Sequence, residues 1–178
     1  DGVAASVGRP NGVSWNSIPD INNLVKIRVV DTGNANVKDD TVSFKIIGGL
    51  VLTAPKDGIT WTAKSTTNNI TWTTSGTIAN VNIYYDSNEG KGADGIQGNA
   101  DDYNSNTPIG TDNASPFLWN PMPDTVTNKG VIKITNADDE TNTYSIGTLF
   151  KVGARFDITD PESGNTTHAS ESYEIKWN

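Results

Sequence analysis

The chain has 178 residues, of which 34% are hydrophobic, and it carries a formal net charge of -8. This charge argues against nucleic acid as a partner, because an acidic surface cannot replace the counterions on a phosphate backbone. No apolar run approaches the roughly 20 residues that a membrane-spanning helix needs, so we expect no membrane span.

Alternating apolar and polar residues, the pattern of strands with one buried face, run through the whole sequence. Near the start, Val25, Ile27 and Val29 share one face of a predicted strand, with Lys26 and Arg28 on the other. Further strands are predicted near 49–54, 59–62, 67–74, 78–86, 107–110, 114–120, 129–137 and 144–152, and alternation resumes at Phe156 and Ile158. No window has the period of an amphipathic helix, so the predicted fold class is all-β.

Five blocks of sequence recur in the same order at an offset of about 105 residues. They are 14–20 with 118–124, 26–27 with 133–134, 44–46 with 150–152, Pro55 and Gly58 with Pro161 and Gly164, and 70–72 with 175–177. A fixed period of this kind indicates a repeat architecture, and its length matches an immunoglobulin-like β-sandwich of about 100 residues. The sequence therefore predicts immunoglobulin-like β-sandwich repeats in tandem.

The repeat divides the chain into three predicted domains. Residues 1–48 hold the C-terminal half of one repeat, 49–152 a complete repeat with an acidic, glycine-rich insertion at 86–106, and 153–178 the first strands of a third. Half a sandwich exposes its core, so two explanations of the ends stay open. The sequence is a window on a longer array, or the last strands of one chain complete the first half-sandwich of another.

Tryptophan takes the place of a disulfide in the predicted core. The chain contains no cysteine, so no bridge can link the two sheets, and we expect Trp72 and Trp119 to fill the space between them. Burial of a side chain of this size removes about 150–250 Å² from water.

The pattern Leu50-x-Leu52-x-x-Pro55-x-x-Gly58-x-x-Trp61, followed by 70–72 and 81–85, resembles the opening half of an immunoglobulin-like repeat. Repeats of this family occur in large bacterial surface proteins and in Ser/Thr-rich cell-wall proteins of yeasts. The resemblance covers essentially the whole chain and implies a secreted or cell-surface protein. Two departures affect one loop: Ala63-Lys64 replaces the usual glycine, and the third copy has no aromatic residue at the position of Trp61.

The insertion is the one segment that the repeat does not explain, and it concentrates Asp, Asn and Glu among glycines. Ca²⁺ prefers six to eight oxygen ligands from carboxylates, amides and backbone carbonyls. The candidate calcium ligands are Asp86, Asn88, Asp94, the Ile96 carbonyl, Asp101 and Asp102. The loop lacks the glutamate that closes an EF-hand. The alternative is an acidic surface insertion without a metal.

Catalysis has little support in the sequence, and we expect the chain not to be an enzyme. His168 is the only histidine, and a base or metal ligand needs companions. A glycosidase needs two carboxyl groups held about 5–10 Å apart across a cleft, and nothing in the pattern indicates one. His168 is therefore expected to be a surface residue.

Two functions remain. The first is a structural element of an extracellular array, such as an S-layer, a surface filament or an adhesin stalk, stiffened by calcium. Its partners would be other copies of the chain or neighbouring repeats. The second is an accessory module of a secreted enzyme or adhesin that binds a protein or a cell-surface polysaccharide. That function needs an exposed aromatic platform, for which Tyr84, Tyr85 and Tyr103 are the candidates, with Tyr84 facing solvent.

Overall fold

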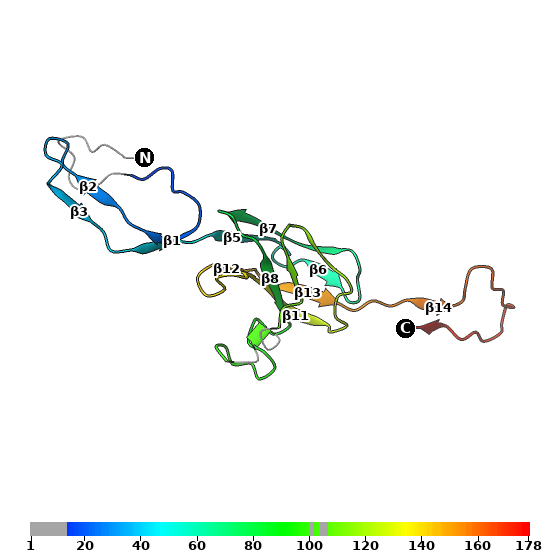
Figure 1. Ribbon diagram of the computed structural model, residues 1–178. Coiled ribbons are helices and arrows are strands. Elements are labelled where there is room, and N and C mark those ends of the chain that lie inside the picture. Colours follow the sequence, from blue (N-terminus) through cyan, green and yellow to red (C-terminus); the bar gives the residue numbers. More distant parts are fainter. Residues whose placement is uncertain (1–13, 100–101, 104–106) are drawn as a thin grey trace.

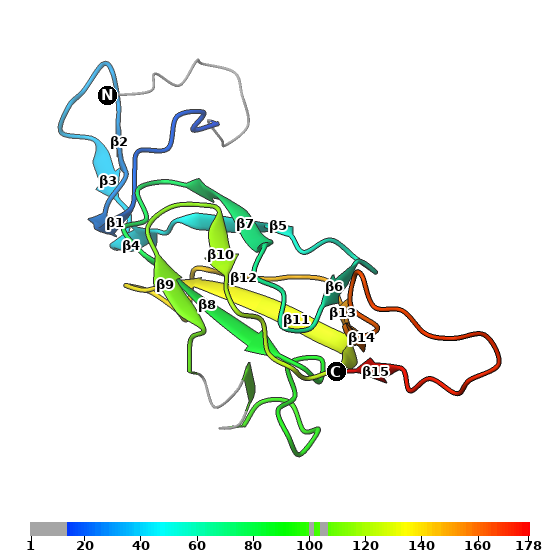
Figure 2. The ribbon, with the colours of Figure 1, turned by 90° about the vertical axis from the view of Figure 1, so that its right-hand side faces the viewer.

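The computed structural model describes residues 14–99, 102–103 and 107–178, and all of its named elements are β-strands. The predicted all-β class is confirmed. Figure 1 shows an N-terminal segment, a central body and a C-terminal hairpin laid out in chain order, and Figure 2 shows the molecule turned by 90°, with the C-terminal side toward the viewer. Among the described residues, no helix has the length and apolar character needed to cross a bilayer.

The N-terminal segment, residues 14–48, contains two separate antiparallel pairs of short strands. Strand β1 (Asn22–Val25) pairs with β4 (Phe44–Ile46), and β2 (Arg28–Val30) pairs with β3 (Lys38–Asp40). The chain changes partner between β1 and β2, where Ile27 and Thr41 exchange hydrogen bonds. This exchange divides the strand predicted around 25–29 into the ends of two short strands, β1 and β2.

The central body consists of two sheets. The smaller has the order β10-β7-β5, formed by β5 (Gly49–Ala54), β7 (Asn68–Ser75) and β10 (Phe117–Trp119). The larger has the order β6-β13-β11-β8-β9, with β12 also paired to β11. Its strands are β6 (Thr60–Thr62), β8 (Val81–Asp86), β9 (Gly110–Asp112), β11 (Thr127–Asn136), β12 (Tyr144–Ile146) and β13 (Phe150–Gly153). All pairs are antiparallel except β6 with β13.

The two sheets share one hydrophobic core, an arrangement consistent with a β-sandwich. Trp72 and Trp119 are each 5% exposed, so both predicted core tryptophans are confirmed. The Trp119 ring meets Tyr85 edge-on at 4.8 Å between centroids and Trp61 at 6.4 Å. Phe150 lies 5.1 Å from Trp61. Aromatic pairs in such tilted arrangements stabilise a core beyond the area that they bury.

The strands of the central body lie within a few residues of their predicted ranges, and two of the differences have a visible cause. The segment 144–152 forms β12 and β13 rather than one strand. Between them, the Gly147 amide donates to the Ile132 carbonyl at 2.8 Å, and a β-carbon on Gly147 would lie 2.5 Å from Leu52. The close approach of β5 thus separates β12 from β13. The strand predicted near 107–110 is shorter and later, because pairing with β8 begins at Gly110.

The C-terminal segment, residues 154–178, is a long hairpin. Strand β14 (Ile158–Asp160) pairs with β15 (Lys176–Trp177). Tyr173 Oη donates to Asp160 Oδ1 at 2.7 Å, and this hydrogen bond lowers the pKa of Asp160. His168 is exposed in the loop of the hairpin, as expected. The large apolar side chains of the hairpin are exposed to solvent.

Candidate functional sites in the acidic insertion and the segment junction

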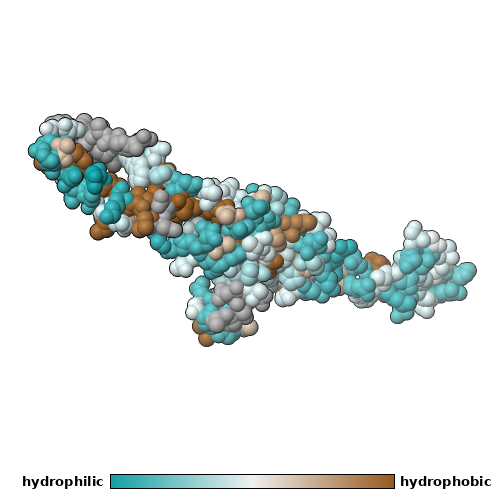
Figure 3. Space-filling model, viewed as in Figure 1, coloured by the Kyte–Doolittle hydropathy of each residue, from teal (hydrophilic) through white to brown (hydrophobic). Residues whose placement is uncertain are grey.

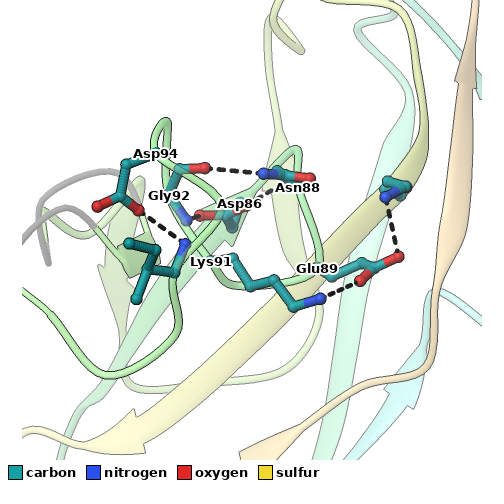
Figure 4. A network of polar contacts seen from close by, with 8 residues as sticks. Asp86, Asn88, Glu89, Lys91, Gly92 and Asp94 are labelled. Atoms are coloured by element: carbon teal, nitrogen blue, oxygen red, sulfur yellow. Dashed lines mark hydrogen bonds and ion pairs between the residues drawn. The ribbon is translucent and has the colours of Figure 1, made fainter.

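The acidic insertion folds around the carboxylate of Asp86, the last residue of β8 (Figure 4). One oxygen accepts the Asn88 amide at 2.5 Å, and the other accepts the amides of Gly92 and Tyr103 at 3.0 Å each. Asp86 is only 4% exposed. A buried carboxylate needs such donors, and here they come from amides up to 17 positions away. Asp86 therefore organises the backbone of the insertion.

Asn88, Asp94 and Ile96 form a more open part of the insertion. Asn88 Nδ2 donates to the Gly92 carbonyl at 3.0 Å. Asp94 Oδ1 accepts the Ile96 amide at 2.8 Å, and its other oxygen accepts Asn99 Nδ2 at 2.8 Å. Ile96 is 63% exposed. Each of these contacts closes a local turn of the loop.

Asp102 is the second buried carboxylate of the insertion, with 9% of its surface exposed. Its Oδ2 accepts the Gly98 amide at 2.7 Å, whereas its Oδ1 is buried without a hydrogen-bond partner. Asp101 lies outside the described residues. Within the part of the chain that the structure describes, no three acidic, histidine or cysteine side chains form a metal-binding group. The calcium prediction stays a prediction.

Glu89 connects the first turn of the insertion to strand β11 and also contacts a lysine of the insertion. Glu89 contacts Lys91 Nζ at 2.6 Å and Lys129 Nζ at 3.3 Å. These two lysines, Lys91 first, lower the pKa of Glu89. The Glu89 amide also donates to the Lys129 carbonyl at 2.9 Å. The sequence pattern gave no indication of this attachment, because Glu89 and Lys129 belong to segments 40 positions apart.

The predicted aromatic platform does not exist as an exposed surface. Tyr84, Tyr85 and Tyr103 are 4%, 7% and 6% exposed. Tyr84 does project from the outer face of its sheet, but Tyr103 of the insertion packs over it with Val131. Tyr85 lies in the core against Trp119. The expectation that Tyr84 faces solvent is therefore wrong, because alternation identifies a face but not what covers it.

Lys133 lies at the centre of this outer cluster. Its ammonium is 5.1 Å from the ring centroid of Tyr103, 5.7 Å from Tyr84 and 6.0 Å from Tyr144. A cation at these distances is attracted to the negative faces of the rings. Glu140 accepts the hydroxyl of Tyr84 at 3.0 Å. The cluster joins the insertion, the sheet and the β12 strand.

The second candidate site is the junction between the N-terminal segment and the central body. The Asp20 carboxylate accepts the amide of Thr77 at 2.7 Å and also the Thr77 hydroxyl. These contacts, with the hydroxyl first, lower the pKa of Asp20. A β-carbon on Gly76 would lie 2.9 Å from Asp20 and 3.0 Å from Ile21. The turn after β7 thus holds the last loop before β1.

Gly48, on the other side of this junction, lies close to two isoleucine side chains. A β-carbon on Gly48 would lie 2.9 Å from Ile21 and 3.0 Å from Ile78.

Comparison of the chain with protein-family models, with curated proteins and with solved structures finds no match. The proposals that follow therefore depend on the residues and geometry of this chain.

Proposed function

We propose that the chain is a non-catalytic structural element of an extracellular cell-surface array, such as an S-layer, a surface filament or an adhesin stalk. Its units would be tandem immunoglobulin-like β-sandwich repeats. The observation that carries the proposal is the strand pairing at the two ends, which has the same register as the pairing in the central body.

At the N-terminal end, Asn22 pairs with Ile46 and Val25 with Phe44, with a register irregularity between the pairs. In the central body, Thr127 pairs with Val152 and Gly130 with Phe150, again with an irregularity. From 22 to 127 the offset is 105, and from 46 to 152 it is 106. The β2–β3 pair follows the same rule, because Arg28–Asp40 corresponds to Lys133–Ile146.

At the C-terminal end, Ile158 pairs with Trp177 and Asp160 with Lys176, with a register irregularity between them. The corresponding pairs in the central body are Leu52 with Trp72 and Ala54 with Thr71, with the same irregularity. The offsets are 106 for the first strand and 105 for the second. Gly58 and Gly164, also 106 apart, both adopt positive φ, at 68° and 93°.

These registers refine the sequence alignment of the repeat. Matching letters aligned Lys26 with Lys133, an offset of 107. Strand pairing aligns Arg28 with Lys133 instead. The face of a strand residue changes with every one-residue shift and is restored by a shift of two. The same set of residues therefore lies on each face in both alignments. The two-residue error of the letter-based alignment thus leaves the alternation of apolar and polar residues unchanged.

The arrangement of the units supports an elongated structural role. Repeats that contact only their neighbours form quasi-one-dimensional assemblies, and the three parts of this chain follow one another along one axis in Figure 1. The hydrogen bonds from Thr77 to Asp20 hold two successive parts together. The resemblance to repeats of bacterial surface proteins and yeast cell-wall proteins points to the same location.

Protease shaving of intact source cells, followed by mass spectrometry of the released peptides, tests the proposed location. Peptides from this chain should appear in the shaved fraction before any cytosolic marker, and antibodies against it should decorate the cell surface in electron micrographs. Recovery of the chain only from the soluble interior of the cells would overturn the proposal.

Calcium is proposed as a stiffening ligand of the insertion, with Asp102 as its main carboxylate. The support is the buried Oδ1 of Asp102, which accepts no hydrogen bond. Asp86, Asn88, Asp94, Asp101 and the Ile96 carbonyl complete the proposed ligand set. Oxygen ligands on a glycine-rich loop suit a hard cation such as Ca²⁺.

Thermal unfolding in millimolar Ca²⁺ and in chelator tests the calcium proposal. Binding to the folded state alone should raise the Tm in proportion to the logarithm of the calcium concentration. Asp102→Asn should abolish this shift, whereas Asp57→Asn, at an exposed position outside the insertion, should preserve it. Equal melting curves of the parent chain in Ca²⁺ and in chelator would exclude a calcium site of useful affinity.

A further inference from the structure

The N-terminal segment carries an apolar surface that nothing in the described structure covers. Val29 and Val30 are 67% and 42% exposed, and Val37 is 57% exposed. They border a shallow hollow of about 330 Å³ that is lined by Val29, Val30, Asp31, Val37, Lys38 and Asp39. Val29 pairs with Asp39 and, with Val37, lies on one side of the β2–β3 pair. We call this side the open face. Figure 3 shows brown, apolar surface on this end of the molecule.

The central body shows what covers the same surface in a complete unit. Register places Val29 at the position of Ile134, which is fully buried. There, strand β5 lies over β11 and β12. The Leu52 amide donates to Ser145 Oγ at 3.2 Å, and Ser145 holds the position of Asp39. The hollow of the open face therefore occupies the place that a β5-type strand fills in the central body.

A strand of the β5 type with its β7-type partner lies exposed at the other end of the chain. In β14 and β15, Ile158 and Trp177 are 69% and 60% exposed. Their counterparts by register are Leu52, which packs against the core, and Trp72, which is 5% exposed. The exposed apolar residues of this hairpin are Phe156, Ile158, Tyr173, Ile175 and Trp177. The hairpin thus has the covering strands that the open face lacks.

Backbone groups at both ends match as well. In the central body, β13 pairs in parallel with β6, and the Lys151 amide donates to the Ile59 carbonyl at 2.8 Å. The counterparts of these two residues at an offset of 106 are Lys45 and Asn165. Strand β10 also pairs with β7 through Trp119. Its counterpart Trp15 is 36% exposed, against 5% for Trp119.

The covering hairpin cannot come from the same molecule. In Figure 1, the N-terminal segment and the β14–β15 hairpin lie at opposite ends of the central body. A strand supplied by a second copy meets the geometric requirement, and addition of strands to an exposed sheet is an established mode of association. Such a contact is heterologous, so it leaves one open end on each partner and can continue.

We infer that the β14–β15 hairpin of a second copy of this chain covers the open face and completes a two-sheet unit with the N-terminal segment. The completed unit has one sheet of the β10-β7-β5 type. Its second sheet contains strands of the β6, β13 and β11 types. Among the described residues, neither partner supplies strands of the β8 and β9 type. The inference rests on the repeat in the proposed function, but not on its cellular location.

Sedimentation of the 178-residue chain over a wide concentration range, about 1–500 μM, tests the inference. The mean mass should rise with concentration in steps of one chain. Tryptophan emission should shift to shorter wavelength as Trp15 and Trp177 leave water. Trp177→Glu should block the covering hairpin, and Val29→Glu should block the open face, so either variant alone should stay monomeric. Both positions lie outside the central core, and circular dichroism melting verifies that this core is intact.

Mixing the two variants separates specific assembly from adhesion of exposed apolar surface. The Val29→Glu chain still offers a working hairpin, and the Trp177→Glu chain still offers a working open face. An equimolar mixture should therefore form a 1:1 dimer and stop there. If the mixture stays monomeric while the parent chain grows, or if the parent chain stays monomeric throughout, the inference is wrong.

A disulfide between copies gives an independent readout, because the chain has no cysteine of its own. Parallel pairing of Lys151 with Thr60 predicts that Lys45 of one copy lies beside Thr166 of the other. Lys45→Cys chains mixed with Thr166→Cys chains should form a mixed disulfide, since paired strand positions fall within bonding reach. Lys45→Cys with Asp57→Cys is the matched control. A chain that assembles this way but is absent from the cell surface would refute only the proposed location.

Discussion

The Asp20 carboxylate accepts the backbone amide of Thr77 at 2.7 Å, although the two residues are 57 positions apart. The bond connects the N-terminal segment to the turn after β7, beside Gly76 and Ile21. Asp20→Ala removes the acceptor for both Thr77 groups. We expect the N-terminal segment to sample a broader range of orientations, while the central core keeps its melting temperature.

Distances between spin labels on exposed Asn36 and Thr111 measure this broadening, with Asp57→Asn as the control acid. The pH dependence has a defined sign, because the pKa of Asp20 is lowered in the folded chain. The ionised carboxylate stabilises the contact fully at pH values above the unfolded pKa of about 3.9. This stabilisation is lost as the pH falls through the lowered pKa of the folded chain. An unchanged label distribution from pH 7 to pH 2 would contradict the role of Asp20.

Trp72 and Trp177 offer a matched comparison of one residue type in two environments. They share a position in the strand register, but Trp72 is 5% exposed and Trp177 is 60% exposed. Trp72→Ala should lower the free energy of unfolding of the central body by about 3–5 kcal/mol. Trp177→Ala should change it by less than about 0.5 kcal/mol, as is usual at exposed positions.

Urea unfolding at low protein concentration, followed by circular dichroism, measures both changes. Low concentration keeps any association of the hairpins out of the comparison. Equal losses in the two variants would show that the hairpin belongs to the cooperative unit of the central body, contrary to its exposure.

The sequence was sufficient for the elements that depend on local patterning. Strand β5 occupies its predicted range, and the tryptophans at 72 and 119 lie in the core as predicted. Both follow from alternation, which decides the buried face of a strand. The pairing register at the ends could not be read from matching letters, because a two-residue shift preserves the pattern of faces.

The sites were less predictable for a physical reason. Tyr84 was placed correctly on the outer face of its sheet, but its burial depends on Tyr103 from a loop whose path no periodicity defines. The sequence predicts Asp86 as a metal ligand, but it does not predict the three backbone amides that Asp86 accepts. Composition identifies a carboxylate in a glycine-rich loop, but it does not distinguish an ion from amide groups as the partner.

Lys133 should anchor the insertion to the sheet through the rings of Tyr84, Tyr103 and Tyr144. Lys133→Met keeps most of the apolar stem and removes the charge. Cation–π contacts contribute about 0.5–2 kcal/mol depending on their exposure, so the insertion should open more often in this variant. Hydrogen exchange at the Gly92 and Tyr103 amides, which Asp86 holds, measures the opening.

Lys151→Met is the control, since Lys151 is exposed on β13 away from these rings. Protection of the two amides should fall by a factor of about 2 to 30 in Lys133→Met, the equivalent of 0.5–2 kcal/mol, and should stay constant in the control. The same protection in both variants would show that packing alone holds the insertion.

Buried tyrosines should make the central body sensitive to alkali. Burial, followed by the charge of Asp86, raises the pKa of Tyr85 to about 12. Burial also raises the pKa of Tyr84 and Tyr103. The unfolded chain ionises near pH 10 and the folded chain later, so folding stability is unaffected below about pH 10 and falls as the pH rises toward 12. For Tyr85 alone the fall amounts to roughly 2–3 kcal/mol.

Tyr85→Phe separates the ionisation of this residue from general alkaline damage. The Tyr85 hydroxyl is buried without a hydrogen-bond partner, so its removal should leave the free energy of unfolding at pH 7 unchanged or raise it by about 1 kcal/mol. Urea unfolding at pH 8, 10 and 11.5 should show a smaller alkaline loss in Tyr85→Phe than in the parent chain. Tyr144→Phe, whose ring is 52% exposed, should retain the full loss. Because the Tyr85 ring stays packed against Trp119 in the variant, any difference at high pH reports the ionising hydroxyl and not the aromatic core.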